Sequence, residues 1–146
     1  MTDDCRAERS ALKNVWPEST LLLCQFHILQ ALWRWLQSDS ETKSDKQRII
    51  NNFKKIMYSK CKKELDQEIK NFIDESKNFK KLEIYINSLL AKKQYFCSCF
   101  RVELPLYGVN TNNIAERYFL NLKEYIFKRM KSLNIIHVIK LIALFF

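Results

Sequence analysis

MTDDCRAERSALKNVWPESTLLLCQFHILQALWRWL, residues 1–36, is the stretch that decides the fold of this chain. Apolar residues recur at helical intervals over Asp4–Val15, and Pro17 ends that segment because a proline disfavours helix at the residue before it. The apolar run Leu21–Cys24 is too short for a buried helix and predicts a buried strand. A second helical repeat begins near Gln25. The stretch therefore predicts a helix, a short strand, a tight junction and a second helix.

The rest of the chain predicts more helix. Its 146 residues contain one Gly and two Pro, whereas sheets joined by tight turns need many more of both. Three apolar stripes at helical spacing follow a polar loop at 38–44, and all three are expected to form core. They are Ile49, Ile50, Phe53, Ile56 and Met57; then Leu65, Ile69, Phe72 and Ile73; then Leu82, Ile84, Tyr85, Leu89 and Leu90. No run of eighteen apolar residues is present, so we expect no membrane span.

The formal net charge is +9, and it is uneven along the chain. Residues 1–40 carry −1, residues 41–104 carry +6 and residues 105–146 carry +4. A basic surface attracts nucleic-acid phosphates because binding releases counterions. The same composition also fits a solvated helix surface, and charge alone does not separate these two interpretations.

Cys24 and His27 lie at the predicted strand-to-helix junction, and both residue types bind zinc. A tetrahedral zinc needs two more ligands, which Cys97 and Cys99 would supply if their loop folds back. The alternative is structural: a buried cysteine beside a hydrogen-bonded histidine. With five cysteines in a lysine-rich chain, we expect reduced thiols.

Asp3, Asp4 and Glu116 also have an ordinary structural interpretation. An aspartate before a helix is a common N-cap, and Asn113 with Glu116 has the spacing of a capping box. A cluster of cations follows Glu116 at Arg117, Lys123, Lys128 and Arg129. Positive charge towards the end of a helix is favoured by the helix dipole even without a ligand.

Two blocks of sequence nevertheless resemble one family. TDD-x3-E-x2-AL-x3-WP followed by LLLCQFH-x2-QALWRWL is similar to the catalytic core of Mutator-like (MULE) transposases. LPLYGVNTNNIAERYFLNLKEYIFKRMKSLN, residues 104–134, resembles the segment around that family's third acidic residue. The blocks cover roughly half of the chain and follow the family's order.

The resemblance implies a site and a function. Asp3, with Asp4 as the fallback, matches the second catalytic aspartate, and Glu116 matches the third acidic residue. In such enzymes the carboxylates bind two divalent metals about 4 Å apart, which favours Mg²⁺ or Mn²⁺. The Cys24–His27 motif would support that site, and Arg117, Lys123, Lys128 and Arg129 would hold DNA. The implied activity is cut-and-paste DNA transposition in the nucleus.

The chain also departs from the family. No segment with the family's first aspartate occurs in these 146 residues, so we expect this polypeptide alone to be inactive. The predicted strand would then lack sheet neighbours and expose an unpaired edge. Apolar faces around Trp33, Trp35 and Phe145 would favour association into homo-oligomers.

The predicted fold class is mainly α, a fragment of a ribonuclease-H-like α/β core with one short strand and an all-α insertion. Residues 1–36 would be the partial core, 37–104 the helical insertion and 105–146 the C-terminal core helices. The alternative function is a helical nucleic-acid-binding or protein-interaction module without catalysis.

Overall fold

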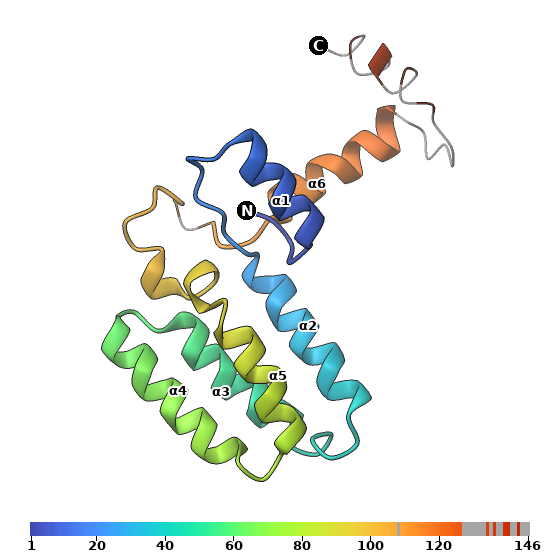
Figure 1. Cartoon of the computed structure of the whole chain (residues 1–146). Helices are drawn as coiled ribbons and strands as arrows, with labels where there is room; N and C mark the ends of the chain where they lie inside the picture. Colours follow the sequence, from blue (N-terminus) through green and yellow to red (C-terminus); the bar gives the residue numbers. More distant parts are fainter. Residues whose placement is uncertain (108, 127–133, 135, 137–138, 141–142, 144–146) are drawn as a thin grey trace. The chain divides into compact units, whose positions relative to one another are not determined.

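The computed structural model describes residues 1–107, 109–126, 134, 136, 139–140 and 143 (Figure 1). The chain divides into two compact units, Met1–Thr111 and Asn112–Phe146, and each is described by itself. The first unit holds five α-helices within the described residues: α1 (Arg6–Val15), α2 (Gln25–Ser38), α3 (Lys46–Tyr58), α4 (Lys62–Ser76) and α5 (Lys80–Leu90). Two short 3₁₀ helices follow, η1 (Lys93–Tyr95) and η2 (Ser98–Phe100). The mainly helical class is confirmed.

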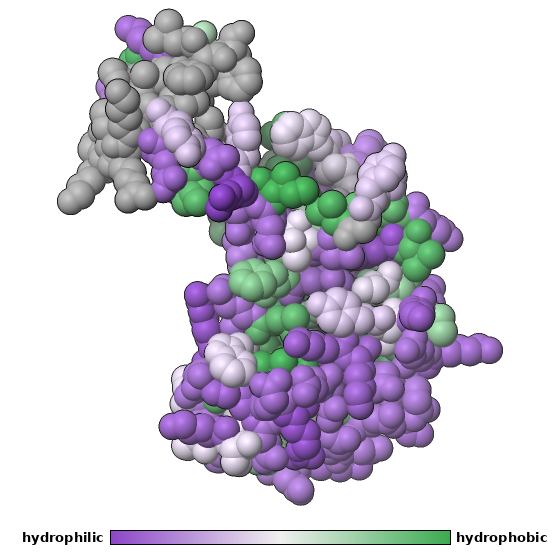
Figure 2. Space-filling view, turned by 180° about the vertical axis from the view of Figure 1, so that it is seen from behind, coloured by the Kyte–Doolittle hydropathy of each residue, from purple (hydrophilic) through white to green (hydrophobic). Residues whose placement is uncertain are grey.

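Helices α2 to α5 form the core of the first unit. Helix α3 packs between α2 and α4, and α5 packs against α4. All five residues of the predicted α3 stripe are buried, and the ring of Phe53 contacts Phe72 and Phe96 at centroid distances of 6.3 and 6.0 Å. Figure 2 shows that the outer surface of these helices on the viewed face is mostly hydrophilic. Their apolar stripes therefore meet inside the unit, as helical periodicity predicts.

The stripe predicted for α5 is wrong at one position. Ile84 is 67 % exposed, and the buried side of α5 carries Leu82, Ile86, Leu89 and Leu90 instead. Residues four and seven positions after Leu82 share its face, whereas a residue two positions away points elsewhere. Tyr85, which was also predicted, stacks on Trp35 with ring centroids 4.7 Å apart.

The predicted strand Leu21–Cys24 is reduced to a single parallel bridge between Thr2 and Leu23 among the described residues. Thr2 N donates to Leu22 O and Cys24 N donates to Thr2 O, both at 2.9 Å. On the other side, Leu23 N donates to Tyr95 O at 2.9 Å and a side-chain N–H of Arg101 donates to Leu23 O. The expected unpaired edge is therefore wrong at Leu23, because residues 95–101 cover it.

The predicted boundary between residues 36 and 37 does not separate compact units. Leu32 and Leu36 of α2 belong to the same buried cluster as Phe53 of α3 and Leu82 of α5. A helix whose buried side chains belong to a shared core is part of the same compact unit as the helices that it packs against. The structural boundary lies at Thr111 instead.

The two tryptophans of α2 have different surroundings. Trp35 is half-buried by its stack on Tyr85, so its predicted exposure is wrong. Trp33 is 39 % exposed, and Lys46 Nζ lies 4.2 Å above its ring centroid. Phe145 lies outside the described residues. None of the helices in the described part of the chain is long and apolar enough to cross a membrane.

The second unit contains α6 (Asn113–Asn121) and a π-helical turn, η3 (Leu122–Ile126). Helix α6 has no buried residues, and Tyr118 and Phe119 are 50 % and 60 % exposed. Most of the end of the predicted C-terminal core segment, 105–146, lies outside the described residues from residue 127 on.

Candidate functional site

Asp3 and His27 meet at one end of the first unit. Asp3 directly follows the bridge residue Thr2, and His27 lies in the first turn of α2, soon after the partner bridge residue Leu23. Asp3 Oδ1 and His27 Nδ1 are 2.7 Å apart. The Asp3 side chain is 51 % exposed and that of His27 is 22 % exposed, so solvent reaches the pair. The carboxyl ends of two parallel segments therefore present a carboxylate and an imidazole side by side.

Thr2 fixes the start of the chain at this site. It is 1 % exposed, and its hydroxyl contacts the Glu8 carboxylate of α1 and the carbonyl oxygen of Asp3, the latter at 3.0 Å. Its backbone amide and carbonyl are both bonded to the 22–24 segment. These four polar contacts, made by three atoms of Thr2, leave its neighbour Asp3 little freedom to move away from His27.

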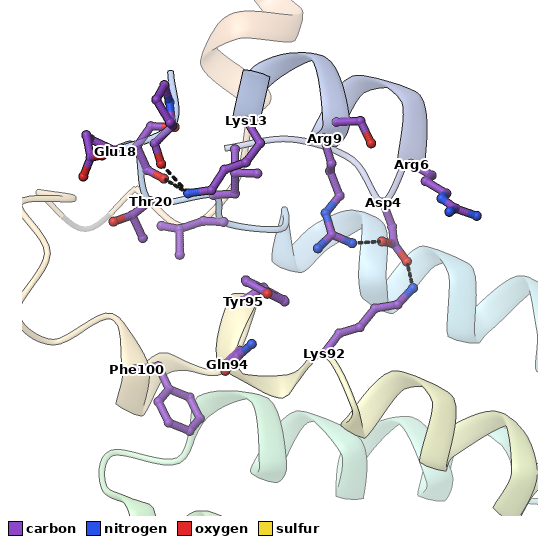
Figure 3. Close-up of a pocket in the computed structure, with 15 residues that line it drawn as sticks. Asp4, Arg6, Arg9, Lys13, Glu18, Thr20, Lys92, Gln94, Tyr95 and Phe100 are labelled. Atoms are coloured by element: carbon purple, nitrogen blue, oxygen red, sulfur yellow. Dashed lines mark hydrogen bonds and ion pairs between the residues drawn. The ribbon is translucent and has the colours of Figure 1, made fainter. Parts of the chain in front are cut away.

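Asp4 lies in different surroundings from Asp3. Its carboxylate accepts hydrogen bonds from Arg9 Nη1 of α1, at 3.2 Å, and from Lys92 Nζ (Figure 3). The two adjacent carboxylates thus have different partners: an imidazole for Asp3, and two cations for Asp4.

Neither of the two predicted helix caps, an aspartate before α1 and a capping box of Asn113 with Glu116, is present at those positions. The N-cap of α1 is Cys5, so neither aspartate occupies that position. Helix α6 begins at Asn113, which makes Asn113 its first helical residue. Glu116 N donates to Asn112 O at 3.0 Å, as in the first turn of a helix whose cap is Asn112.

The zinc site built from Cys24, His27, Cys97 and Cys99 was one of two alternatives, and the cysteines do not gather in that way among the described residues. Cys24 is the buried N-cap residue of α2, Cys97 is buried and Cys99 is half-buried, and all five thiols are free. Within the part of the chain that the structure describes, no group of three or more potential metal ligands includes a cysteine. Burial, reinforced by Cys99, raises the pKa of Cys97 to about 12. Zinc binds thiolates, and a thiol that resists deprotonation is a poor ligand.

Arg101 is a buried residue that the sequence analysis missed. It is 4 % exposed, and its guanidinium donates to the carbonyl oxygens of Leu23 and Tyr95 and to the side-chain oxygen of Asn110, at 3.3 Å. Burial lowers its pKa. The available signal was a lone arginine in the Cys- and aromatic-rich loop at 95–104, since a charge inside an apolar run needs partners.

Gln25 is the second missed residue. It is 2 % exposed, and its side-chain amide donates to Phe96 O at 2.8 Å and to Ser98 Oγ at 3.2 Å. Together Gln25 and Arg101 tie the start of α2 to the loop that returns from α5. They hold the Asp3–His27 site in place without taking part in it.

The predicted DNA-binding residues belong to the second unit. Glu116 and Arg117 lie on α6 and Lys123 lies in η3, and all three are exposed. Lys128 and Arg129 lie outside the described residues. Asp3 and Glu116 belong to separate compact units, and the shared metal site that the resemblance implies for them stays a prediction.

Comparison with known proteins adds no relative: no family model, curated protein or solved structure matches the chain.

Proposed function

We propose that this chain contributes to the catalytic domain of a Mutator-like DNA transposase, with Asp3 as a ligand of a divalent metal and His27 beside it. The observation that carries the proposal is the 2.7 Å approach of Asp3 Oδ1 and His27 Nδ1 at the carboxyl ends of two bridged parallel segments. In α/β folds, functional groups gather at that end of parallel strands. Helix α1 connects the two bridged segments at Thr2 and Leu23, and we propose that this arrangement derives from a ribonuclease-H-like core.

The separation of the two atoms fits adjacent ligands of one ion. Ligands about 2.1 Å from an octahedral ion, at right angles to each other, are about 3 Å apart. The carboxylate oxygen suits Mg²⁺ or Mn²⁺, and the imidazole nitrogen shifts the preference towards Mn²⁺. Asp4 is the weaker candidate, because Arg9 and Lys92 already neutralise its carboxylate.

Glu116 enters the proposal through the resemblance alone. A two-metal centre activates the attacking water or 3′-hydroxyl and stabilises the leaving oxygen of a phosphodiester. In this chain Asp3 would hold the centre from the first unit, His27 would supply its imidazole nitrogen as a neighbouring ligand, and Glu116 would add a carboxylate. The first acidic residue of the family has no match in these 146 residues, so a polypeptide of this length should bind metal without cleaving DNA.

Metal titration tests the site. Calorimetry with Mn²⁺ should show binding that is weakened at least ten-fold by Asp3→Asn and by His27→Ala, with Mg²⁺ bound less tightly. Asp66→Asn, an exposed carboxylate on α4, is the matched control. Equal weakening by Asp4→Asn and Asp3→Asn would overturn the choice of Asp3, and Mn²⁺ binding unaffected by either Asp3→Asn or His27→Ala would overturn the metal site.

Strand cleavage separates this proposal from its alternative, a non-catalytic nucleic-acid-binding module. The net charge of +9 favours DNA binding under both. A polypeptide extended by a donor segment with the family's first aspartate should nick DNA in Mn²⁺, and Glu116→Ala should abolish the nicking. DNA binding without Mn²⁺ binding would favour the module.

A further inference from the structure

A basic groove opens on the first unit between α1, the segment 17–22 and the turn at 92–95 (Figure 3). Its volume is about 1030 Å³. Arg6, Arg9, Lys13 and Lys92 line it, against the carboxylates of Asp4 and Glu18, so cations outnumber anions by two. We call this surface the α1 groove.

One wall of the α1 groove is already an anion site. Arg9 and Lys92 come from opposite sides of the groove, and both bind the Asp4 carboxylate. The Arg9 guanidinium also lies 5.0 Å from the ring centroid of Tyr95, an attraction between cation and ring that helps to position it. A carboxylate clamped between an arginine and a lysine shows where the oxygens of another anion would bind.

The other cations are placed to extend that site. Lys13 Nζ donates to the carbonyl oxygens of Pro17, at 2.6 Å, and Ser19, at 3.3 Å, so its charge is fixed beside the 17–22 segment. Arg6 is exposed and makes no hydrogen bond or ion pair within the described residues. It can therefore meet a ligand without first breaking a contact.

We infer that the α1 groove binds the phosphate backbone of a nucleic-acid strand, and that Asp4 competes with the phosphates for Arg9 and Lys92. This inference rests on the proposed function for its choice of DNA. Cations on two walls fit successive phosphates better than a single one, and the half-buried ring of Phe100 offers a surface for a sugar or base. The Asp4 carboxylate thereby lowers the affinity of the α1 groove for the strand.

The test uses substitutions with opposite expected effects. Fluorescence anisotropy of a labelled 20-nucleotide single strand is measured over a range of KCl concentrations. Asp4→Asn should tighten binding roughly five-fold at 0.1 M salt, because it frees about one phosphate contact. Arg6→Ala and Lys92→Ala should loosen binding by a similar factor and reduce the salt slope by about 0.7 each.

Lys80→Ala is the matched control, because Lys80 is exposed at the opposite end of α5 from Lys92. Circular dichroism verifies that each variant is folded, and Arg6→Ala removes no hydrogen bond or ion pair among the described residues. Equal losses for Lys80→Ala and Arg6→Ala, or no tightening by Asp4→Asn, would overturn the inference. Tight binding of pyrophosphate with no binding of the oligonucleotide would replace the strand by a small phosphate ligand.

The same variants keep this inference distinct from the proposed metal site. Loss of the groove effects with Mn²⁺ binding intact overturns the groove alone. Loss of Mn²⁺ binding with the groove effects intact overturns the metal site alone.

Discussion

Arg101 joins three parts of the first unit at one guanidinium. Its N–H groups bind Leu23 in the bridge, Tyr95 in η1 and Asn110 near the end of the unit. Arg101→Met should destabilise the protein by about 3 kcal/mol, because it leaves buried carbonyl oxygens without donors. Urea unfolding measures this loss, with Arg34→Met, at an exposed position of α2, as the control that should change stability by less than about 0.5 kcal/mol. Equal stability of the two variants would show that water replaces the guanidinium.

Cys97 should be the slowest of the cysteines to react. Burial raises its pKa to about 12, so at pH 8 it is a neutral thiol in a buried position. Cys5 and Cys61 are exposed. Iodoacetamide labelling followed by mass spectrometry should modify these two first, while Cys97 reacts only after unfolding in guanidinium. Labelling of Cys97 as fast as Cys61 would contradict its buried position.

Phe53 on α3 lies at the centre of the core, and the exposed Ile84 on α5 serves as its comparison in stability measurements. Phe53→Ala should cost about 3 to 5 kcal/mol, because it removes a ring packed between Phe72 and Phe96. Ile84→Ala should cost less than about 0.5 kcal/mol, since that side chain faces solvent on α5. Thermal unfolding of both variants checks the difference. A large cost at Ile84 would mean that another surface covers it.

Helices were the elements that the sequence predicted well. The predicted stripe of α3 matched the buried side chains because a helix repeats every 3.6 residues. The stripe predicted for α5 also included Ile84, which faces solvent. The strand was less predictable, since a bridge at Leu23 depends on partners at Thr2 and Tyr95, far away in the sequence.

The residue types of the candidate site could be predicted from the sequence, but the contacts between these residues could not. Asp3 and His27 stood out by residue type, but their 2.7 Å approach depends on the bridge between Thr2 and Leu23. The α1 groove was hidden for another reason. Three of its four cations lie in residues 1–40, which carry a net charge of −1. The net charge of each segment therefore placed the basic surface in residues 41–146 and not at the groove.

For the whole molecule, the division at Thr111 predicts that residues 1–111 fold alone. They contain the complete buried cluster of α2 to α5 and the contacts of Arg101 with Asn110. A polypeptide of residues 1–111 should unfold cooperatively, with a midpoint within a few degrees of the full chain. It should also keep the near-ultraviolet signal of the stacked Trp35 and Tyr85 rings. Loss of cooperativity would show that the core needs residues beyond Thr111.

The contacts that cover Leu23 also set an order of folding. Helices α2 to α5 meet mostly as neighbours along the chain, whereas the bonds from Tyr95 and Arg101 to Leu23 close loops of more than seventy residues. Long loops close late and open early because their closure entropy is recovered only when the last contact forms. The amides of Leu23 and Cys24 should therefore exchange with deuterium sooner than those in the middle of α3. Within the first unit, the end that carries Asp3 and His27 would then be the last part to assemble, after the helices α2 to α5 have packed together.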